Sequence, residues 1–215
     1  MKKVFLSIIF IALSASSLLA ADEMLQLPAP EKTGGMSLLQ AISERHSARE
    51  FADVDLTQQQ LSNLLWAVAG VNRDDGRRVY PVSTGMQDTF VYVFVREGVY
   101  KYDPLSNALL LIEAGDHRAD TTDRQDFVAK AAVNLVYVQD TSLWRNRKVP
   151  LETIQKWGFA HTGAAMQDAY LYAASQGWNA VVRAWADPTK LSKLLKLAEG
   201  QEVTLVQSIG PRAEH

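Results

Sequence analysis

The sequence contains no cysteine, and this absence excludes several kinds of chemistry at once. Disulfides, thiolate nucleophiles and cysteine metal sites are all impossible in such a chain. The histidines do not replace them, because none of them shows the His-x-x-x-His spacing typical of a metal site (His46, His117, His161 and His215). The folded chain must therefore be stabilised by its core or by oligomerisation.

Common catalytic and nucleotide-binding signatures are also missing. The chain has no Gly-x-Ser-x-Gly elbow, no Walker loop and no Gly-x-Gly-x-x-Gly. An excess of positive charge is missing as well, since 22 Lys and Arg residues stand against 24 Asp and Glu residues. We therefore expect no general binding of nucleic acid.

Residues 1–21 have the layout of a secretory signal peptide. Two lysines open the segment, an apolar run follows over residues 4–13, and small residues ending in Leu-Leu-Ala-Ala close it. We expect cleavage near Ala20 or Ala21, a periplasmic or secreted protein, and no stable membrane insertion afterwards. The alternative is a membrane anchor, but a spanning helix needs about 20 predominantly apolar residues, and this run is shorter and serine-rich.

The rest of the chain is predicted to be one domain behind a short arm. Residues 22–35 contain Pro28, Pro30 and Gly34-Gly35 and are expected to form an extended N-terminal arm. No internal repeat or second linker follows, so residues 36–215 are predicted to form one domain. They are long enough for a substantial core.

Helix and strand signals are interleaved irregularly in that domain, which predicts the class α+β. Capping signals, apolar periodicity and glycine stops predict helices over residues 37–46, 57–70, 124–130, 150–176 and 187–195. Alternating and β-branched runs predict strands over residues 90–96, 99–103, 107–112, 133–138, 179–185 and 202–209. Within the long helix, Gly158 and Gly163 would let another backbone approach closely.

The most informative segment is Arg45–Phe51, which reads Arg-His-Ser-Ala-Arg-Glu-Phe. Guanidinium forks bind phosphate oxygens bidentately, and a neighbouring hydroxyl adds a third donor. The segment therefore suggests a phosphate-bearing ligand, which Arg45 and Arg49 are expected to cradle together. The alternative is a solvated helix terminus whose cations complement the helix dipole.

Arg-x-Ser-x-Arg-x-Phe resembles the opening motif of the nitroreductase-like flavoproteins, which bind FMN. Residues 61–73 read Leu-Ser-x-Leu-Leu-Trp-Ala-x-x-Gly-x-Asn-Arg and resemble the periplasmic and SagB-type dehydrogenase branch of that family. The resemblance runs from about Gly35 to Gly210. It implies a mixed, mainly antiparallel sheet wrapped by helices, in an intertwined homodimer that binds FMN non-covalently.

The resemblance also implies cofactor-binding roles for four residues of the first motif. In the family, the positions of Arg45, His46, Ser47 and Arg49 grip the FMN phosphate and ribityl chain. The second arginine can also reach the pyrimidine edge of the flavin, where a cation stabilises the anionic reduced form. His46 is expected to contribute a backbone contact.

Residues 80–87 resemble a second cofactor-binding segment, where the family usually has Pro-Ser followed by an asparagine and a glutamine. Pro81, Ser83 and Gln87 are the candidates in this chain, while Val82 and Gly85 depart from the pattern. Amide side chains suit the uracil-like edge of the flavin, which offers both donors and acceptors. A plain loop leading into a strand is the alternative for the individual side chains.

Residues 181–185 resemble the family segment that lies over the isoalloxazine ring, where backbone N–H groups approach N5. Arg183 and Ala184 are the candidates, with Ala184 in the place of a usual glycine. The alternative is a buried strand with Trp185 in the core; Arg183 argues against it, because an unpaired guanidinium in a core is costly. Near the C-terminus, Arg212 either completes the phosphate site or frays in solvent.

Residues 161–168 of the long helix resemble a family stretch that ends in Gln-Asn, with Asp168 in place of the asparagine. We expect this stretch to lie at the dimer interface and His161 to be structural rather than catalytic. Trp66, Trp157 and Trp185 are candidate aromatic neighbours of a stacked substrate, or else core residues.

The resemblance implies an exported FMN-dependent oxidoreductase that passes hydride or electrons between the flavin and a small planar substrate. The cofactor would perform the chemistry, so no side chain need act as a nucleophile. NAD(P)H is one candidate electron donor, although it is scarce outside the cytoplasm, and a dehydrogenase that oxidises its substrate through the flavin is a variant. The alternative from a different class is a flavin- or ligand-binding module of the same fold without turnover.

Overall fold

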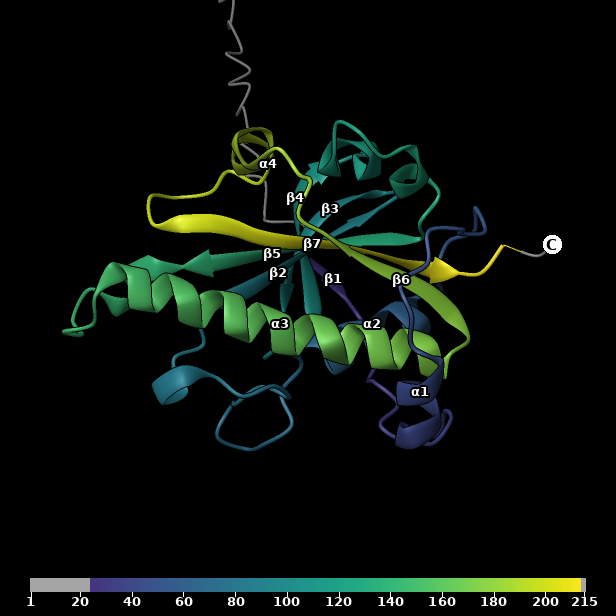
Figure 1. The fold of residues 1–215 in the computed structure, drawn as a ribbon, viewed down its shortest axis with the longest axis horizontal. Helices are drawn as coiled ribbons and strands as arrows, with labels where there is room; N and C mark the ends of the chain where they lie inside the picture. Colours follow the sequence, from purple (N-terminus) through teal and green to yellow (C-terminus); the bar gives the residue numbers. More distant parts are fainter. Residues whose placement is uncertain (1–23, 214–215) are drawn as a thin grey trace, which may run out of the picture.

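The computed structural model describes residues 24–213, so the predicted signal peptide lies outside the described residues. A seven-stranded sheet forms the centre of the molecule, in the order β1-β4-β3-β2-β5-β7-β6 (Figure 1). Its strands are β1 (Met24–Gln26), β2 (Thr89–Val95), β3 (Gly98–Asp103), β4 (Ala108–Ala114), β5 (Val133–Asp140), β6 (Trp178–Arg183) and β7 (Gln201–Pro211). Neighbouring strands of this sheet all pair antiparallel, and a parallel bridge joins Ser47 to Ala180 beside it.

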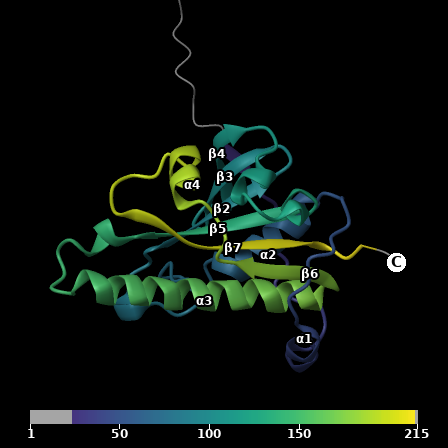
Figure 2. The same cartoon turned by 45° about the horizontal axis from the view of Figure 1, so that its top comes forward.

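Helices cover both faces of the sheet, which confirms the predicted α+β class. They are α1 (Leu38–Glu44), α2 (Gln58–Ala69), α3 (Leu151–Ser175) and α4 (Pro188–Leu194), with 3-10 turns at Ser83–Gly85, Arg118–Thr121, Asp126–Ala129 and Thr141–Trp144. Figures 1 and 2 show α3 running along one face, with α4 on the opposite face. The long helix predicted after Pro150 is confirmed.

Local signals explain where two of the helices begin. The Thr57 side chain accepts a hydrogen bond from the Gln60 backbone N–H, and the Gln60 side chain accepts one from the Thr57 backbone N–H, so the capping box of α2 is complete. Asp187 starts α4 by accepting backbone hydrogen bonds from Thr189 and Lys190.

Two predicted elements have other bounds in the structure. The helix predicted over residues 124–130 is only a 3-10 turn at Asp126–Ala129, because no side chain caps it and the chain continues almost at once into β5. The strand predicted to reach Trp185 ends at Arg183, and the Trp185 side chain is 63% exposed rather than in the core.

Part of the predicted N-terminal arm belongs to the sheet. Met24–Gln26 pairs antiparallel with the edge of β4, and Leu27 after it is buried against the core. The unpaired backbone groups of an edge strand are a ready template for such pairing. The remainder of the arm, residues 27–35, runs on to α1 without regular structure.

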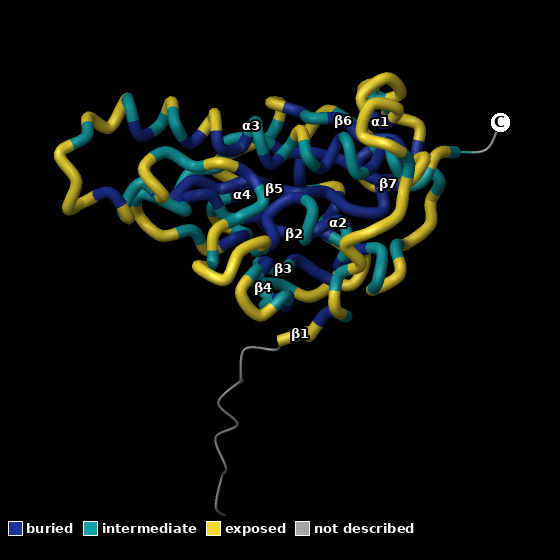
Figure 3. Tube along the Cα trace, turned by 90° about the horizontal axis from the view of Figure 1, so that it is seen from below, coloured by how far each residue is buried: buried dark blue, intermediate teal, exposed yellow. Residues whose placement is uncertain are grey.

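The core has two layers because side chains alternate across the sheet. Val91, Val93, Leu135 and Tyr137 point to the face covered by α2 and α3. The intervening residues point to the face covered by α4 (Tyr92, Phe94, Val136, Val138). Figure 3 shows the buried strands between these layers and the alternation of buried and exposed positions along α3.

The two glycines of α3 have different surroundings. A Cβ on Gly158 would lie 2.0 Å from the side-chain amide carbon of Gln139, a buried residue of β5, whereas a Cβ on Gly163 would meet nothing within 4 Å. What packs against Gly158 is therefore a side chain of this same chain and not another backbone. Gly163 faces open space.

We predict opposite effects on stability for the two glycine-to-alanine substitutions. Gly158→Ala should lower the free energy of unfolding by about 1–3 kcal/mol, because the new methyl group displaces a buried side chain. The matched control Gly163→Ala should raise it by about 0.4–1 kcal/mol, because alanine favours the helix and nothing obstructs it. Urea denaturation of both variants checks this, and equal effects would contradict the assigned contact.

Candidate functional site

The segment Arg45–Phe51 leaves α1 as an extended chain that docks across the ends of β6 and β7. Arg45 has an extended backbone, at φ −60° and ψ 120°, so α1 ends before the motif. The Ala48 N–H donates to the Ala180 carbonyl at 3.0 Å, and the Ala52 N–H donates to the Pro211 carbonyl at 2.9 Å. Phe51 is buried between these contacts.

This docking brings three of the predicted phosphate-binding residues together. Arg45, His46 and Arg212 line one small pocket with the rings of Tyr170 and Trp178. The Arg45 guanidinium carbon lies 5.2 Å from the centroid of the Tyr170 ring, in the range of a cation–π contact. Arg212, for which the sequence left two alternatives open, thus lies at the pocket that Arg45 also lines.

The acidic neighbour of this pocket has partners of its own. Glu44 also lines the pocket, and its carboxylate accepts a hydrogen bond from Gln40 at 2.9 Å. No salt bridge within residues 24–213 involves Arg45, Arg49 or Arg212. The charges of these guanidiniums are therefore available to an anion.

The two arginines of the motif do not form a single fork. The Arg49 guanidinium lies 6.0 Å from the centroid of the Phe127 ring, whereas Arg45 lies over Tyr170. An extended chain rises by roughly 3.3 Å per residue, which separates the two Cα atoms by about 13 Å. In this arrangement the two guanidiniums lie over different rings, and the expectation that they cradle one phosphate together stays a prediction.

The Ser47 hydroxyl is tied to α3 and β6 through a tyrosine. Its Oγ lies 2.9 Å from the Tyr170 hydroxyl oxygen, which also accepts a hydrogen bond from the Val182 N–H at 2.7 Å. When Tyr170 donates its proton to Ser47, the Ser47 proton is left for a ligand. The motif, the long helix and the segment around Val182 thus form one connected edge.

Most of the side chains predicted to contact the cofactor from residues 81–87 form hydrogen bonds within the protein instead. Ser83 begins a 3-10 turn in which Thr84 and Gly85 both have positive φ, at 53° and 74°. The Gln87 side chain donates to the Gly76 carbonyl at 3.2 Å and so holds a neighbouring loop. Pro81 is exposed beside this turn.

A buried chain of hydrogen bonds holds Ser83 from behind. The His161 Nδ1 lies 2.8 Å from the Asp88 carboxylate, and its Nε2 accepts the Ser83 N–H at 2.8 Å. The other carboxylate oxygen of Asp88 accepts from Gln139 and Trp144, each at 2.8 Å. Burial alone raises the pKa of Asp88, but the hydrogen bonds from His161, Gln139 and Trp144 outweigh it and hold this pKa below its usual value.

Sequence reasoning did not single out Asp88. Its nearest partners are far along the chain, since His161 follows 73 residues later. The only local signal was an acidic residue directly before a strand that is otherwise apolar. His161, expected to be structural, is buried in this network.

The Arg183 side chain is not available to a ligand. It is 4% exposed and donates to Ser208, to Asn134 and to both the carbonyl and the hydroxyl of Thr121, at 3.0–3.2 Å. Burial lowers its pKa to about 10. The argument that Arg183 opposes burial is wrong, because the guanidinium is buried without being unpaired. Only the backbone of residues 183–184 is left as a candidate contact, with Ala184 just after β6.

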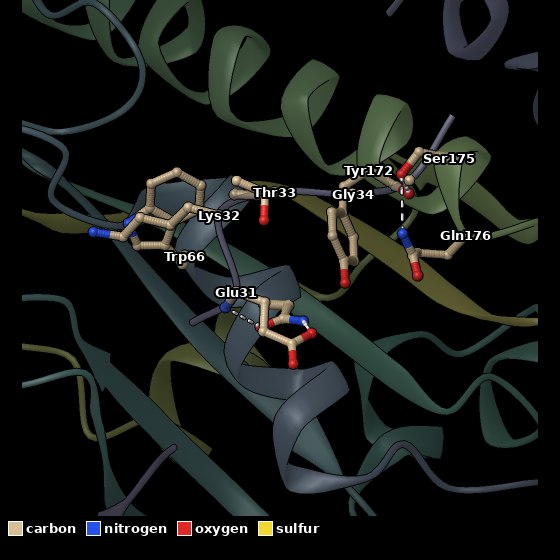
Figure 4. Close-up of a pocket in the computed structure, with 11 residues that line it drawn as sticks. Glu31, Lys32, Thr33, Gly34, Trp66, Tyr172, Ser175 and Gln176 are labelled. Atoms are coloured by element: carbon tan, nitrogen blue, oxygen red, sulfur yellow. Dashed lines mark hydrogen bonds between the residues drawn. The ribbon is translucent and has the colours of Figure 1, made fainter. Parts of the chain in front are cut away.

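A cavity of about 360 Å³ lies between the N-terminal arm, α2 and the end of α3 (Figure 4). The Lys32 ammonium lies 5.3 Å from the centroid of the Trp66 ring, and the Glu31 N–H donates to the Asn63 side chain at 2.8 Å. None of the predicted cofactor-binding residues lines this cavity. Trp66 is thus part of a separate feature.

Trp157, another candidate aromatic neighbour of a substrate, packs against Trp144 with ring centroids 5.3 Å apart. Within residues 24–213, no group of three or more His, Asp or Glu side chains is placed to hold a metal ion. In that same range, no helix has the length and apolar character needed to cross a bilayer.

The chain is similar to known proteins both in sequence and in structure. The profile of the nitroreductase family matches residues 42–211. A provisionally named nitroreductase of Methanocaldococcus jannaschii is 30% identical over 189 residues, which cover 81% of this chain and 90% of that protein. The crystal structure of a provisionally named nitroreductase of Ralstonia eutropha JMP134 is 40% identical, covers 89% of this chain and 90% of that one, and superposes with a TM-score of 0.83.

A more distant structure shares the fold. The NADPH:FMN oxidoreductase of Vibrio harveyi, solved with NAD+, is 18% identical and has a TM-score of 0.62, with 82% of this chain and 69% of that chain covered.

The half-buried carboxyl group of Asp168 on α3 should make the free energy of unfolding depend on pH. Burial raises the pKa of Asp168 to about 6. Because the folded state favours the protonated acid, this contribution to stability is complete below about pH 4 and is lost as pH rises through about 6. Asp168→Asn should therefore be more stable than the wild type at pH 8 by about 1 kcal/mol, after allowance for screening of a half-buried group, and no more stable at pH 4.

Thermal melts of Asp168→Asn at both pH values measure this difference. Asp74→Asn, which makes the same substitution at an exposed position, is the control. A constant difference between Asp168→Asn and the wild type at pH 4 and pH 8 would contradict the raised pKa.

Proposed function

Because the chain belongs to the nitroreductase family, we propose that it is an exported, FMN-dependent oxidoreductase that passes hydride or electrons between the flavin and a small planar substrate. The observation that carries this proposal is the pocket lined by Arg45, His46 and Arg212 at the ends of β6 and β7. The predicted signal peptide supports export.

The donors around this pocket suit the phosphate of FMN, which would lie at its mouth because the cavity itself holds only about 10 Å³. Two guanidiniums without a salt bridge among the described residues can neutralise a dianion, and the Ser47 hydroxyl lies at the same edge. Arg49 lies farther along the extended segment, over Phe127. That separation suits contacts to two different parts of one long cofactor better than a shared grip on its phosphate.

Bound FMN would supply the hydride and electron chemistry, and this chain would supply position and electrostatic field. Arg45, Ser47 and Arg212 would hold the phosphate end. The backbone of residues 183–184 and the turn at Ser83–Gly85 would orient the ring. The proton could come from solvent, since no side chain need act as a nucleophile.

Exposed apolar side chains support a homodimer. Leu38, Leu39 and Ile42 of α1 are 64%, 78% and 51% exposed, and Phe159 of α3 is 51% exposed. Large apolar side chains that are exposed close together, as on α1, mark protein–protein contacts, and α1 immediately precedes the Arg45 motif. A second copy of the chain would cover this surface beside the cofactor.

The electron donor divides the proposal into two forms. With NAD(P)H as donor the protein is a reductase of its substrate. In the other form, expected outside the cytoplasm, the substrate itself would be the donor, as in the SagB-type branch, and a separate electron acceptor such as a quinone would reoxidise the flavin. Reduction of the bound flavin by each candidate donor, followed by its absorbance, distinguishes the two.

A flavin-binding module without turnover is the second candidate function. It is favoured by the engagement of Arg183 and Gln87 inside the protein, which removes two predicted side-chain contacts to the flavin. Reduction of the bound flavin with dithionite and reoxidation by a quinone or a nitroaromatic tests this. Bound flavin that is reoxidised no faster than free flavin would favour the module.

We predict that Arg45→Ala weakens FMN binding tenfold or more. The substitution removes a charge-assisted phosphate contact worth about 1.5–3 kcal/mol. A fluorescence titration of FMN measures the dissociation constant. The control is Arg124→Ala, an exposed arginine whose nearest acidic partner is Asp123 at 3.6 Å, and which should leave the affinity unchanged. Unchanged affinity in Arg45→Ala would contradict the assigned role.

We also predict that Leu39→Asp converts the protein to a monomer, because a charge at the centre of the apolar α1 surface cannot be buried without a partner. Sedimentation velocity measures the mass in solution. The control Leu105→Asp changes a leucine of similar exposure, 75%, in the turn between β3 and β4. The expectation fails if the wild type is monomeric, or if Leu39→Asp stays dimeric.

A further inference from the structure

The network behind Ser83 fixes the proton positions of His161. The Asp88 carboxylate is fully buried and can only accept hydrogen bonds, so the His161 Nδ1 facing it at 2.8 Å carries a proton. The lone pair of Nε2 is then free to accept. It accepts the backbone N–H of Ser83 at 2.8 Å, which defines a neutral imidazole held between a sheet residue and a loop.

The same three residue types form the catalytic triad of serine hydrolases, but the geometry here differs in one respect. In a triad the imidazole lone pair takes the proton of the serine hydroxyl. In this protein the backbone N–H of Ser83 occupies that lone pair, while the Ser83 hydroxyl oxygen lies farther away, at 3.1 Å. The arrangement therefore holds the backbone of Ser83 rather than activating its hydroxyl.

The backbone that follows Ser83 needs such a restraint. Thr84 has φ 53°, a conformation that a β-branched residue rarely adopts, and Gly85 follows at φ 74°. Residues in sparsely populated backbone regions persist only when their surroundings over-determine them. Within the turn itself the Met86 N–H donates to the Ser83 carbonyl at 3.0 Å, and His161 supplies the contact from outside the turn.

Asp88 is in turn held rigidly. Gln139 and Trp144 donate to it, Gln139 also donates to the Ile154 carbonyl on α3, and the Asp140 N–H donates to the Asp88 carbonyl at 2.8 Å. The imidazole is therefore clamped by the sheet and by α3 before it reaches the loop.

From this geometry we infer that His161, oriented by Asp88, is a positioning residue that fixes the turn Ser83–Gly85 in the conformation required to bind the cofactor. The inference rests on the proposed function, in which this turn orients the flavin ring. His161 acts through the Ser83 backbone and does not itself touch the cofactor.

The test compares His161→Leu, which removes the acceptor and keeps an apolar side chain of moderate size, with His161→Gln, whose amide oxygen can accept the Ser83 N–H. Lys156→Ala, an exposed substitution on the same helix, is the control. Hydrogen exchange of the Ser83 amide in flavin-free protein reports on the restraint. The FMN dissociation constant and the absorption band of the bound flavin report on the cofactor, and circular dichroism confirms that each variant is folded.

In His161→Leu the Ser83 amide should exchange at least about tenfold faster and FMN should bind at least about tenfold more weakly, since one buried hydrogen bond is lost. His161→Gln should recover part of both losses. Faster exchange with unchanged FMN affinity and spectrum would overturn the inference while leaving the proposed function intact. A wild-type protein that binds no FMN would overturn both.

Two measurements on the wild type keep the inference testable if His161→Leu does not fold. The nitrogen chemical shifts of His161 should show the neutral form protonated at Nδ1, and a proton on Nε2 at neutral pH would overturn the inference. A serine-directed fluorophosphonate should not label Ser83, and labelling would replace the positioning role by a nucleophilic one.

Discussion

The candidate site depends on the backbone hydrogen bonds that dock residues 47–52 across the ends of β6 and β7. Ala48 bonds to Ala180 and Ala52 to Pro211, and the burial of Phe51 between them closes the contact. Ser47 and Tyr170, 123 residues apart in the chain, meet only because of this docking. It also brings Arg212 to the pocket that Arg45 lines, so that guanidiniums from two segments distant in the sequence lie at one pocket.

Two buried polar networks support this edge from inside. Arg183 is held by Thr121, Asn134 and Ser208, and His161 links Asp88 to Ser83. Buried polar groups must find hydrogen-bond partners, and in both networks neutral groups or a single carboxylate satisfy them. These requirements explain why side chains that resemble ligand contacts in the sequence point into the protein. Around these two networks, only backbone groups and the shape of the surface would remain to contact a cofactor.

Local signals in the sequence predicted most of the elements. The Thr57 capping box, Pro150 before α3 and Asp187 before α4 each act within a few residues, and the structure confirms all three helices. Contacts between distant segments were not predictable in this way. Nothing near Met24 indicates that β4 has a free edge, and nothing near Arg183 names Thr121 or Asn134 as its partners.

The motif itself shows the same limit. In the sequence Arg45 and Arg49 are only four residues apart, and this spacing suggested that their guanidiniums bind one phosphate together. An extended backbone separates them, and Arg45 instead shares a pocket with Arg212, which only the family resemblance had linked to the phosphate.

The central claim is that this edge of the sheet binds a flavin through its phosphate. The most direct test is to compare the affinity of the wild-type protein for FMN and for riboflavin, which differ only in that group. The account predicts that FMN binds at least about tenfold more tightly, since the phosphate contacts are charge-assisted, and that the advantage shrinks as salt is added. Equal affinity for the two flavins, or no affinity for either, would contradict it.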